Sequence, residues 1–272
     1  MIYVDLAAEL TPMVASPFGR GYREYEPCEA LKPYVRCFWT GEGKDGGLII
    51  PDLCADIIFD IDMNTVFFCG VSDKPFQARD MTRSFGIRFY SWTAALFSED
   101  TLRGTLNGNF ELGWHFRRFE KEIAPRISAA ETIEQRIEIA ERFLLNDLHE
   151  RRSGLFTQAL GEIMERRGAC GVIDISKELH VSSRQLERVF AEYSGLPPKK
   201  MAALVRYQYL WRDILLGRRF SAAEKALEYG YTDQSHLLND FRKFHTMSPK
   251  QARENALGVI AGINDNLMER LS

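Results

Sequence analysis

The stretch YTDQSHLLNDFRKFHTMSP, from Tyr231 to Pro249, places Leu237, Phe241 and Phe244 at helical spacing. Its exposed positions carry Gln, Ser, His, Asn, Arg and Lys rather than the usual Glu and Lys of a solvated helix face. Gln and Asn pair bidentately with adenine, Ser and His bond to base edges or phosphates, and an exposed Leu touches a thymine methyl group. The pattern predicts a DNA-reading helix whose outward side chains are Gln234, Ser235, His236, Leu238, Asn239 and Arg242.

A related helix is expected upstream, in DISKELHVSSRQLERVFAEYSG. Leu186, Val189 and Phe190 give this helix an inward face, and Ser182 with Gln185 forms a capping box at its start. The side chains that turn outward, and that suit guanine edges, cytosine amino groups and phosphates in a major groove, are those of Arg184, Glu187 and Arg188.

The two helices belong to a duplicated unit. Leu186 and Phe190 recur 51 residues later as Leu237 and Phe241, and each pair follows a short helix and a tight turn. In the second copy Ser221 and Glu224 form a capping box for the short helix, Gly230 suits a left-handed turn residue, and Asp233 caps the reading helix. This arrangement predicts two helix-turn-helix units.

A long helix is expected between the copies, from Pro197 to Gly217. About 19 residues at 1.5 Å each make a rod of about 28 Å. Two reading helices must sit about 34 Å apart to enter successive major grooves on one side of B-form DNA. A stiff connector of this length would hold both helices near that separation.

The amino-terminal half shows a different pattern. Four short segments rich in β-branched and aromatic residues predict strands at Tyr34–Trp39, Gly47–Asp62, Thr65–Val71 and Ser84–Tyr90. No helical pattern intervenes, so an antiparallel barrel or sandwich is expected. From about Leu112 the period becomes helical, and a capping box at Ser128 and Glu131 is expected to begin a helix. Its apolar stripe, which either packs on its own domain or pairs with a second subunit, contains Ile133, Ile137, Ala140, Leu144 and Leu148.

Composition indicates two globular domains in 272 residues, of which 45% are hydrophobic and 27% charged. Residues 154–256 hold 16 Lys and Arg against 12 Asp and Glu, so this part carries +4 and the remainder −7 of the net −3. A basic half joined to an acidic half fits a nucleic-acid surface on one domain. No apolar run reaches about 18 residues and the start of the chain lacks a targeting pattern, so a cytoplasmic location without membrane contact is expected.

Catalytic and metal sites are not expected. Asp52, Cys54 and Asp56 lie close in sequence to Asp60 and Asp62, but strand-end and turn carboxylates explain them better than a cation site. No Ser-His-Asp or Cys-His grouping, glycine-rich phosphate loop or metal-ligand spacing stands out, so we expect no catalytic residues, no metal and no cofactor. The cysteines that could form a thiol sensor, although burial would keep them inert, are Cys37, Cys54 and Cys69. The aromatic residues that either line a small-molecule cavity or form the core are Phe38, Trp39, Phe59, Phe67, Phe68, Phe89, Tyr90 and Trp92.

About 100 residues, from Leu155 to Asn255, resemble the DNA-binding domain of AraC-type transcription regulators. The motifs that carry this resemblance are VSSRQLERVF and GYTDQSHLLNDFRKFHTMSP. The resemblance implies that both helix-turn-helix units contact DNA. His180 and Ser176 depart from it, since Gly and Ala are usual at those positions. The segments YREYEPCEALKPYVRCFW, PDLCADIIFD and FGIRFYSWTAALF resemble the β-rich, cupin-like domain that often precedes such a unit, which implies a regulatory role.

We therefore expect an α+β protein with a β-rich sensor or oligomerisation domain over residues 1–152, a DNA-binding domain over 153–256 and a tail over 257–272. The expected function is sequence-specific transcription regulation, modulated by a signal sensed in the first domain. Expected partners are promoter DNA, a small-molecule effector, a second subunit and, for an activator, RNA polymerase. Two alternatives remain open: a DNA repair or modification protein with a reactive cysteine, and a protein-docking module, although the latter expects a more apolar outward face.

Overall fold

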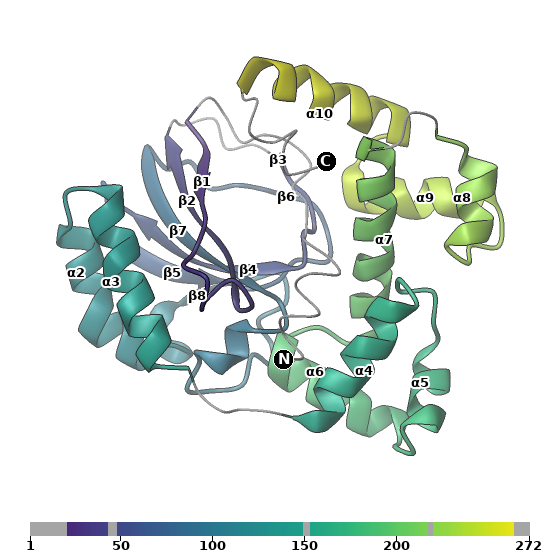
Figure 1. Ribbon diagram of the computed structural model, residues 1–272, viewed down its shortest axis with the longest axis horizontal. Helices are drawn as coiled ribbons and strands as arrows, with labels where there is room; N and C mark the ends of the chain where they lie inside the picture. The colour runs from purple at the N-terminus through teal and green to yellow at the C-terminus, as the bar shows by residue number, and fades with distance from the viewer. Residues whose placement is uncertain (1–20, 43–47, 149–152, 217–219, 264–272) are drawn as a thin grey trace.

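The computed structural model describes residues 21–42, 48–148, 153–216 and 220–263. A mostly-β half lies beside an all-α half, with the long helix α7 (Pro198–Leu216) facing the β half from the inner side of the helical half (Figure 1). The predicted combination of a β-rich half followed by a helical half is confirmed.

Six antiparallel strands form the main sheet, in the order β1-β2-β7-β4-β5-β8. They are β1 (Arg23–Tyr25), β2 (Val35–Glu42), β7 (Arg83–Tyr90), β4 (Cys54–Asp60), β5 (Thr65–Cys69) and β8 (Asn109–Glu111). The register pairs Trp39 with Gly86, and Asp56 with both Arg88 and Cys69. Because side chains alternate across a strand, paired residues share a face, so these five lie on one side of the sheet.

The opposite face of the sheet is apolar and carries the core. It is covered by two short turns, η2 (Leu112–Trp114) and the π-helical η3 (Phe119–Ile123), and by α2 (Ala124–Ala129) and α3 (Ile133–Asn146). Phe59 of the sheet packs on Phe119 at 6.3 Å between ring centroids, and Phe119 packs on Phe143 at 5.3 Å. The helical end is thus part of the β-rich half.

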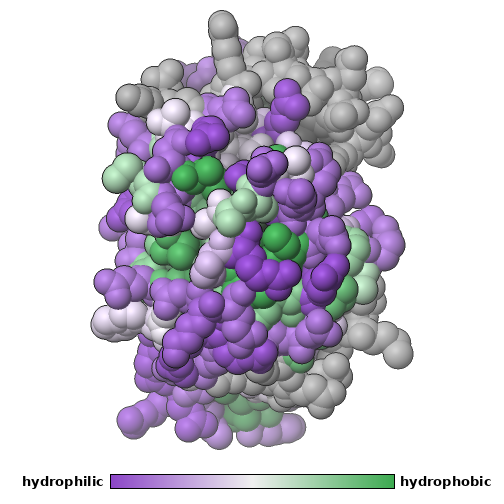
Figure 2. Space-filling model, turned by 90° about the vertical axis from the view of Figure 1, so that its left-hand side faces the viewer, coloured by the Kyte–Doolittle hydropathy of each residue, from purple (hydrophilic) through white to green (hydrophobic). Residues whose placement is uncertain are grey.

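The structure corrects one prediction about this helical end, the position of the capping box, and shows where the apolar stripe packs. The capping box of α3 is formed by Thr132 and Gln135, not by Ser128 and Glu131, because α2 already includes Ser128 and the chain turns three residues later. In the apolar stripe, Ala140 and Leu144 are buried against the chain's own domain, while the other members are partly buried. The outer surface of this side is mainly hydrophilic, with separate small hydrophobic areas (Figure 2).

A second sheet consists of β3 (Leu48–Ile49) and β6 (Phe76–Gln77). The single strand predicted over Gly47–Asp62 is interrupted because Leu53 adopts a left-handed φ of 57°, which no regular strand contains. The strands β1, β6 and β8 were not predicted; each has only two or three residues, too few to show alternation.

The helical half continues through α10. A short turn, η1 (Ala94–Leu96), precedes β8 in the β half, and the helices beyond α3 are α4 (Gly154–Glu165), α5 (Val172–Glu178), α6 (Ser183–Ser194), α7, α8 (Ala222–Glu228), α9 (Gln234–His245) and α10 (Pro249–Ile263). The predicted domain boundary between residues 152 and 153 falls partly outside the described residues, and the predicted helix end at Gly217 falls wholly outside them. None of the helices in the described ranges is both long and apolar enough to cross a membrane.

Candidate nucleic-acid interface and amino-terminal cavity

The first helix-turn-helix unit consists of α5 and α6. The predicted capping box is confirmed, since the Ser182 hydroxyl accepts a hydrogen bond from the Gln185 amide at 3.2 Å and the Gln185 side chain accepts one from the Ser182 amide at 2.9 Å. The turn before it contains His180 at φ 53°, in the left-handed region that favours glycine. The departure from the expected glycine therefore leaves a strained residue but does not prevent the turn.

The second unit consists of α8 and α9. Gly230 adopts the predicted left-handed conformation at φ 67°, and Asp233 caps α9 by accepting a hydrogen bond from the His236 amide at 2.8 Å. Ser221 accepts a hydrogen bond from the Glu224 amide, which is one of the two bonds of the predicted capping box. The caps and the glycine define where each helix starts and stops.

Both reading helices present their predicted outward positions at the surface. The inward residues Leu186, Phe190, Leu237 and Phe241 are fully buried. The exposed candidates are Arg184, Glu187, Arg188, Gln234, Ser235, His236, Asn239 and Arg242, while Leu238 is half-buried. The fold thus brings each set to one helix face. Helix α6 lies at the start of α7, and α9 packs against the middle of α7 through Tyr207 and Trp211 (Figure 1).

The helix α7 is held by buried polar contacts as well as by apolar ones. The Tyr207 hydroxyl and His245 Nδ1, at the end of α9, lie 2.8 Å apart, and burial lowers the pKa of His245 to about 4. The neutral imidazole and the hydroxyl are thus joined by a buried hydrogen bond. Arg206 lies 3.8 Å from Asp240 of α9 and 4.4 Å above the Tyr231 ring. These contacts orient the second reading helix on the rod.

The same rod contacts the β half. Gln208, fully buried on α7, donates a hydrogen bond from Nε2 to the Pro51 carbonyl at 2.8 Å. Near the start of α7, Lys200 pairs with Asp73 at 2.5 Å. A backbone hydrogen bond also joins the Leu102 amide to the Glu192 carbonyl at the end of α6. The two halves therefore meet through polar contacts that reach both α7 and the first reading helix.

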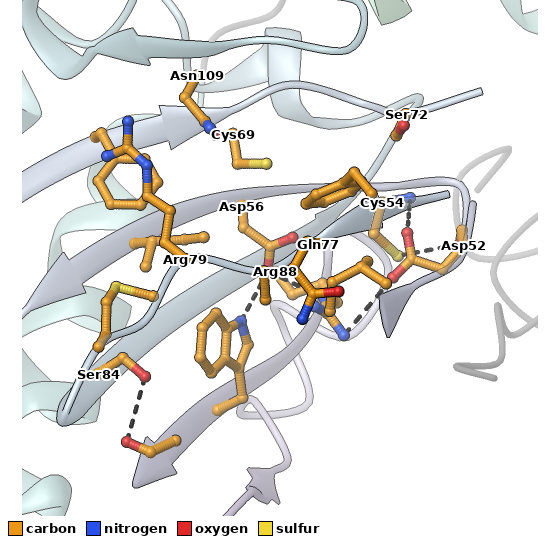
Figure 3. A pocket seen from close by; sticks show the side chains of 18 of the residues that line it. Asp52, Cys54, Asp56, Cys69, Ser72, Gln77, Arg79, Ser84, Arg88 and Asn109 are labelled. Atoms are coloured by element: carbon orange, nitrogen blue, oxygen red, sulfur yellow. Dashed lines mark hydrogen bonds and ion pairs between the residues drawn. The ribbon is translucent and has the colours of Figure 1, made fainter. Parts of the chain in front are cut away.

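A cavity of about 430 Å³ lies on the open face of the main sheet. Its lining comes from both sheets and the segments between them, and Figure 3 shows most of these side chains. In the main sheet the lining residues occupy alternating positions along each strand, because those side chains point to the same face. They are Trp39 and Gly41, Ser84 and Arg88, Cys54, Asp56 and Ile58, Phe67 and Cys69, and Asn109. At Gly86 a Cβ atom would overlap the Trp39 indole, so only glycine lets that ring lie across the neighbouring strand.

The floor of the cavity holds a buried charge cluster (Figure 3). Arg88 Nε lies 3.0 Å from Asp56 Oδ1, and Arg88 Nη1 lies 3.7 Å from Asp52 Oδ2. The indole Nε1 of Trp39 donates to the same Asp56 oxygen at 2.7 Å. Burial raises the pKa of Asp52, and Arg88 partly opposes that shift. One guanidinium and two carboxylates therefore lie together in the lining of the cavity, among mainly apolar side chains.

The structure shows which of the aromatic residues and carboxylates singled out from the sequence line the cavity and which do not. Among the aromatic residues, Trp39 and Phe67 line the cavity. The others are buried core: Phe38, Phe59, Phe68 and Phe89 on the other face of the sheet, Tyr90 on the same face but outside the cavity lining, and Trp92 beyond the end of β7. Asp60 accepts a turn hydrogen bond from the Met63 amide and Asp62 pairs with Arg83, as expected for turn carboxylates. Within the described ranges no three His, Cys, Asp or Glu side chains come together as a metal site.

The cysteines bear on the repair alternative. All five are free thiols within the described residues, and burial raises the pKa of each, to about 12 for Cys37 and Cys69. A reactive cysteine needs the opposite shift, because the thiolate is the nucleophile. Cys54 and Cys69 do line the cavity, but as protonated thiols.

Arg88 was not among the residues predicted from the sequence. A usable signal was present: in SFGIRFY a charged residue stands inside a strand of apolar and aromatic neighbours. Buried arginine is rare unless paired, so the strand required a carboxylate partner, and PDLCADIIFD supplied two.

Residues 175–255 match the family model described as a helix-turn-helix domain. The carboxy-terminal half is an AraC-type DNA-binding domain. This AraC-type domain identifies the chain as a DNA-binding transcription regulator. Residues 23–108 match a second model, described as a domain of unknown function (DUF6597).

Solved structures similar to this chain include the carboxy-terminal domain of AraT, a response regulator from Geobacillus stearothermophilus, at 22% identity over 39% of this chain and 88% of that one, with a TM-score of 0.35. An AraC-type regulator from Chromobacterium violaceum is 26% identical over 36% and 92%, with a TM-score of 0.31. ToxT from Vibrio cholerae is 12% identical over 88% and 91%, with a TM-score of 0.37. No curated protein matches the chain. At these TM-scores, the AraC-type assignment depends on the family match and on the two helix-turn-helix units.

Proposed function

We propose that this regulator binds promoter DNA with α6 and α9 in two adjacent major grooves, and that a small molecule in the amino-terminal cavity modulates the binding. The observation that carries the proposal is the exposure of two polar faces on duplicated helices, of which α6 comes directly before α7 and α9 packs against the middle of α7. The 19 residues of α7 span about 28 Å, close to the separation of about 34 Å between successive grooves.

The proposed base contacts follow from side-chain chemistry. Arg184 and Arg188 suit guanine, Glu187 suits cytosine, and Gln234 and Asn239 suit adenine. The side chains proposed for phosphates, base edges or a thymine methyl group are those of Ser235, His236, Leu238 and Arg242. Arginine and lysine contacts with phosphates release counterions, so affinity should fall steeply as salt rises.

The modulation has a physical route. The segment from Pro51 to Cys54 contributes Asp52 to the cavity floor and the Pro51 carbonyl to the bond from Gln208 on α7. Directly after Asp52, Leu53 is buried at a positive φ, a conformation that persists only when its surroundings hold it. A ligand that displaces Asp52 would therefore act on the rod that carries both reading helices.

The test is fluorescence anisotropy on DNA from upstream of the protein's own gene and on a scrambled duplex, at two salt concentrations. Arg184→Ala and Asn239→Ala should each cost about 1–3 kcal/mol on the cognate duplex and relax base preference. Arg142→Ala and Asn146→Ala are matched controls, because both side chains are exposed on α3. Binding indifferent to sequence and salt contradicts the proposal, and equal losses in variants and controls contradict the assigned contacts.

A further inference from the structure

We infer that the cavity above Asp52, Asp56 and Arg88 binds an organic cation, a protonated amine carried on an apolar body. The inference rests on the proposed role of the amino-terminal half as a sensor, and it names the class of signal.

The charge of the cavity floor points to a cation. Asp52, Asp56 and Arg88 are 9%, 7% and 5% exposed, so all three are shielded from water. Among the described residues, the Arg88 guanidinium alone pairs with both carboxylates, so the cluster has a net negative charge when both are ionised. The other guanidinium of the lining, that of Arg79, is exposed and lies over the Phe67 ring. An anionic ligand would add a third negative charge beside them, whereas a cation would neutralise the excess.

The carboxylates also have hydrogen-bonding capacity left. Asp56 Oδ1 accepts from both Trp39 and Arg88, while Asp56 Oδ2 accepts no hydrogen bond from any described residue. Asp52 Oδ1 accepts from the Cys54 amide at 3.1 Å, but Asp52 Oδ2 is 3.7 Å from the guanidinium, too far for a hydrogen bond. Two acceptor oxygens of largely buried carboxylates beside the cavity fit the N–H groups of an ammonium ion.

The walls suit the rest of such a ligand. Trp39, Phe67 and Phe76 contribute aromatic rings, whose faces attract cations, and Ile58 and Met81 contribute aliphatic surface. Two guanidiniums already lie over these rings, Arg79 at 4.7 Å from the centre of Phe67 and Arg88 at 5.8 Å from that of Trp39. A volume of about 430 Å³ matches small-molecule sites of about 300–1,000 Å³.

The first test compares three probes with one apolar body and different heads: 4-phenylbutylamine, 4-phenylbutanol and 4-phenylbutyrate. Isothermal titration calorimetry with the full chain should show the amine binding at least about tenfold more tightly than the alcohol, and the carboxylate binding most weakly. Equal affinities, or tightest binding of the carboxylate, overturn the inference without any variant.

The second test removes the charge. Asp52→Asn keeps an oxygen for the Cys54 amide but lowers the negative charge, so it should weaken amine binding about tenfold and leave alcohol binding unchanged. Asp62→Asn removes a carboxylate that pairs with exposed Arg83 and does not line the cavity, so it should bind the amine like the wild type. Amine affinity unchanged in folded Asp52→Asn overturns the inference.

The same preparations separate this inference from the proposed function. Protein that binds DNA with sequence preference but does not prefer the amine contradicts the ligand class alone. Folded protein that prefers the amine but ignores DNA contradicts the proposed function and leaves the cation site standing.

Discussion

Replacing His245 tests how the second reading helix is anchored. This imidazole is 2% exposed at the end of α9, stacks on Phe241 at 4.9 Å between ring centroids, and lies 4.4 Å from the Trp211 ring. Its environment supplies the hydroxyl of Tyr207, which is a hydrogen-bond partner, and apolar rings. Burial therefore disfavours the charged form and lowers the pKa of His245 from 6.5 to about 4.

The sign of the pH effect follows from this shift. The unfolded chain takes up a proton on this histidine near pH 6.5, whereas the folded chain does so only near pH 4, so acid favours the unfolded state between those values. The resulting loss of stability is close to zero at about pH 7.5, about 2 kcal/mol at about pH 5 and about 3 kcal/mol below about pH 4.

Urea denaturation of the wild type and His245→Gln, at about pH 7.5 and about pH 5, measures the effect. Glutamine keeps an acceptor for Tyr207 but does not titrate, so the wild type should lose about 2 kcal/mol more than the variant between the two pH values. His236→Gln, at an exposed position on the same helix, is the control and should follow the wild type. If His245→Gln loses as much stability in acid as the wild type, the reasoning about the buried imidazole is refuted.

Two further predictions concern the turn and the rod. His180→Gly should raise the free energy of unfolding by about 0.5–1 kcal/mol, because glycine relieves the left-handed strain, whereas Gly230→Ala at the matching turn should lower it by about 1–2 kcal/mol; thermal unfolding distinguishes the opposite signs. Gln208→Leu should cost about 1–3 kcal/mol in urea denaturation by leaving the buried Pro51 carbonyl without that donor. Lys200→Ala, which breaks a more exposed contact between the halves, should cost about 1 kcal/mol or less, and a Gln208→Leu variant no weaker than Lys200→Ala would contradict the assigned bond.

Features with a local cause were predictable from the sequence. The box of Ser182 with Gln185, the cap at Asp233 and the left-handed Gly230 each depend on residues within a few positions. The spacing of Leu237 and Phe241 likewise determined which side of α9 is buried and which side is exposed. The local rule failed at Ser128, where helix α2 extended over the position expected to cap α3.

By itself, then, the sequence determined the two-part architecture, the duplicated reading helices and their outward side chains, because periodicity and caps are properties of neighbouring residues. Only the tertiary structure decided that Arg88 joins Asp52 with Asp56, that Trp39 lines a cavity while Phe38 beside it is core, and that Gln208 ties α7 to Pro51. These depend on strand register and on contacts between residues as far apart as 157 positions, which no local pattern encodes.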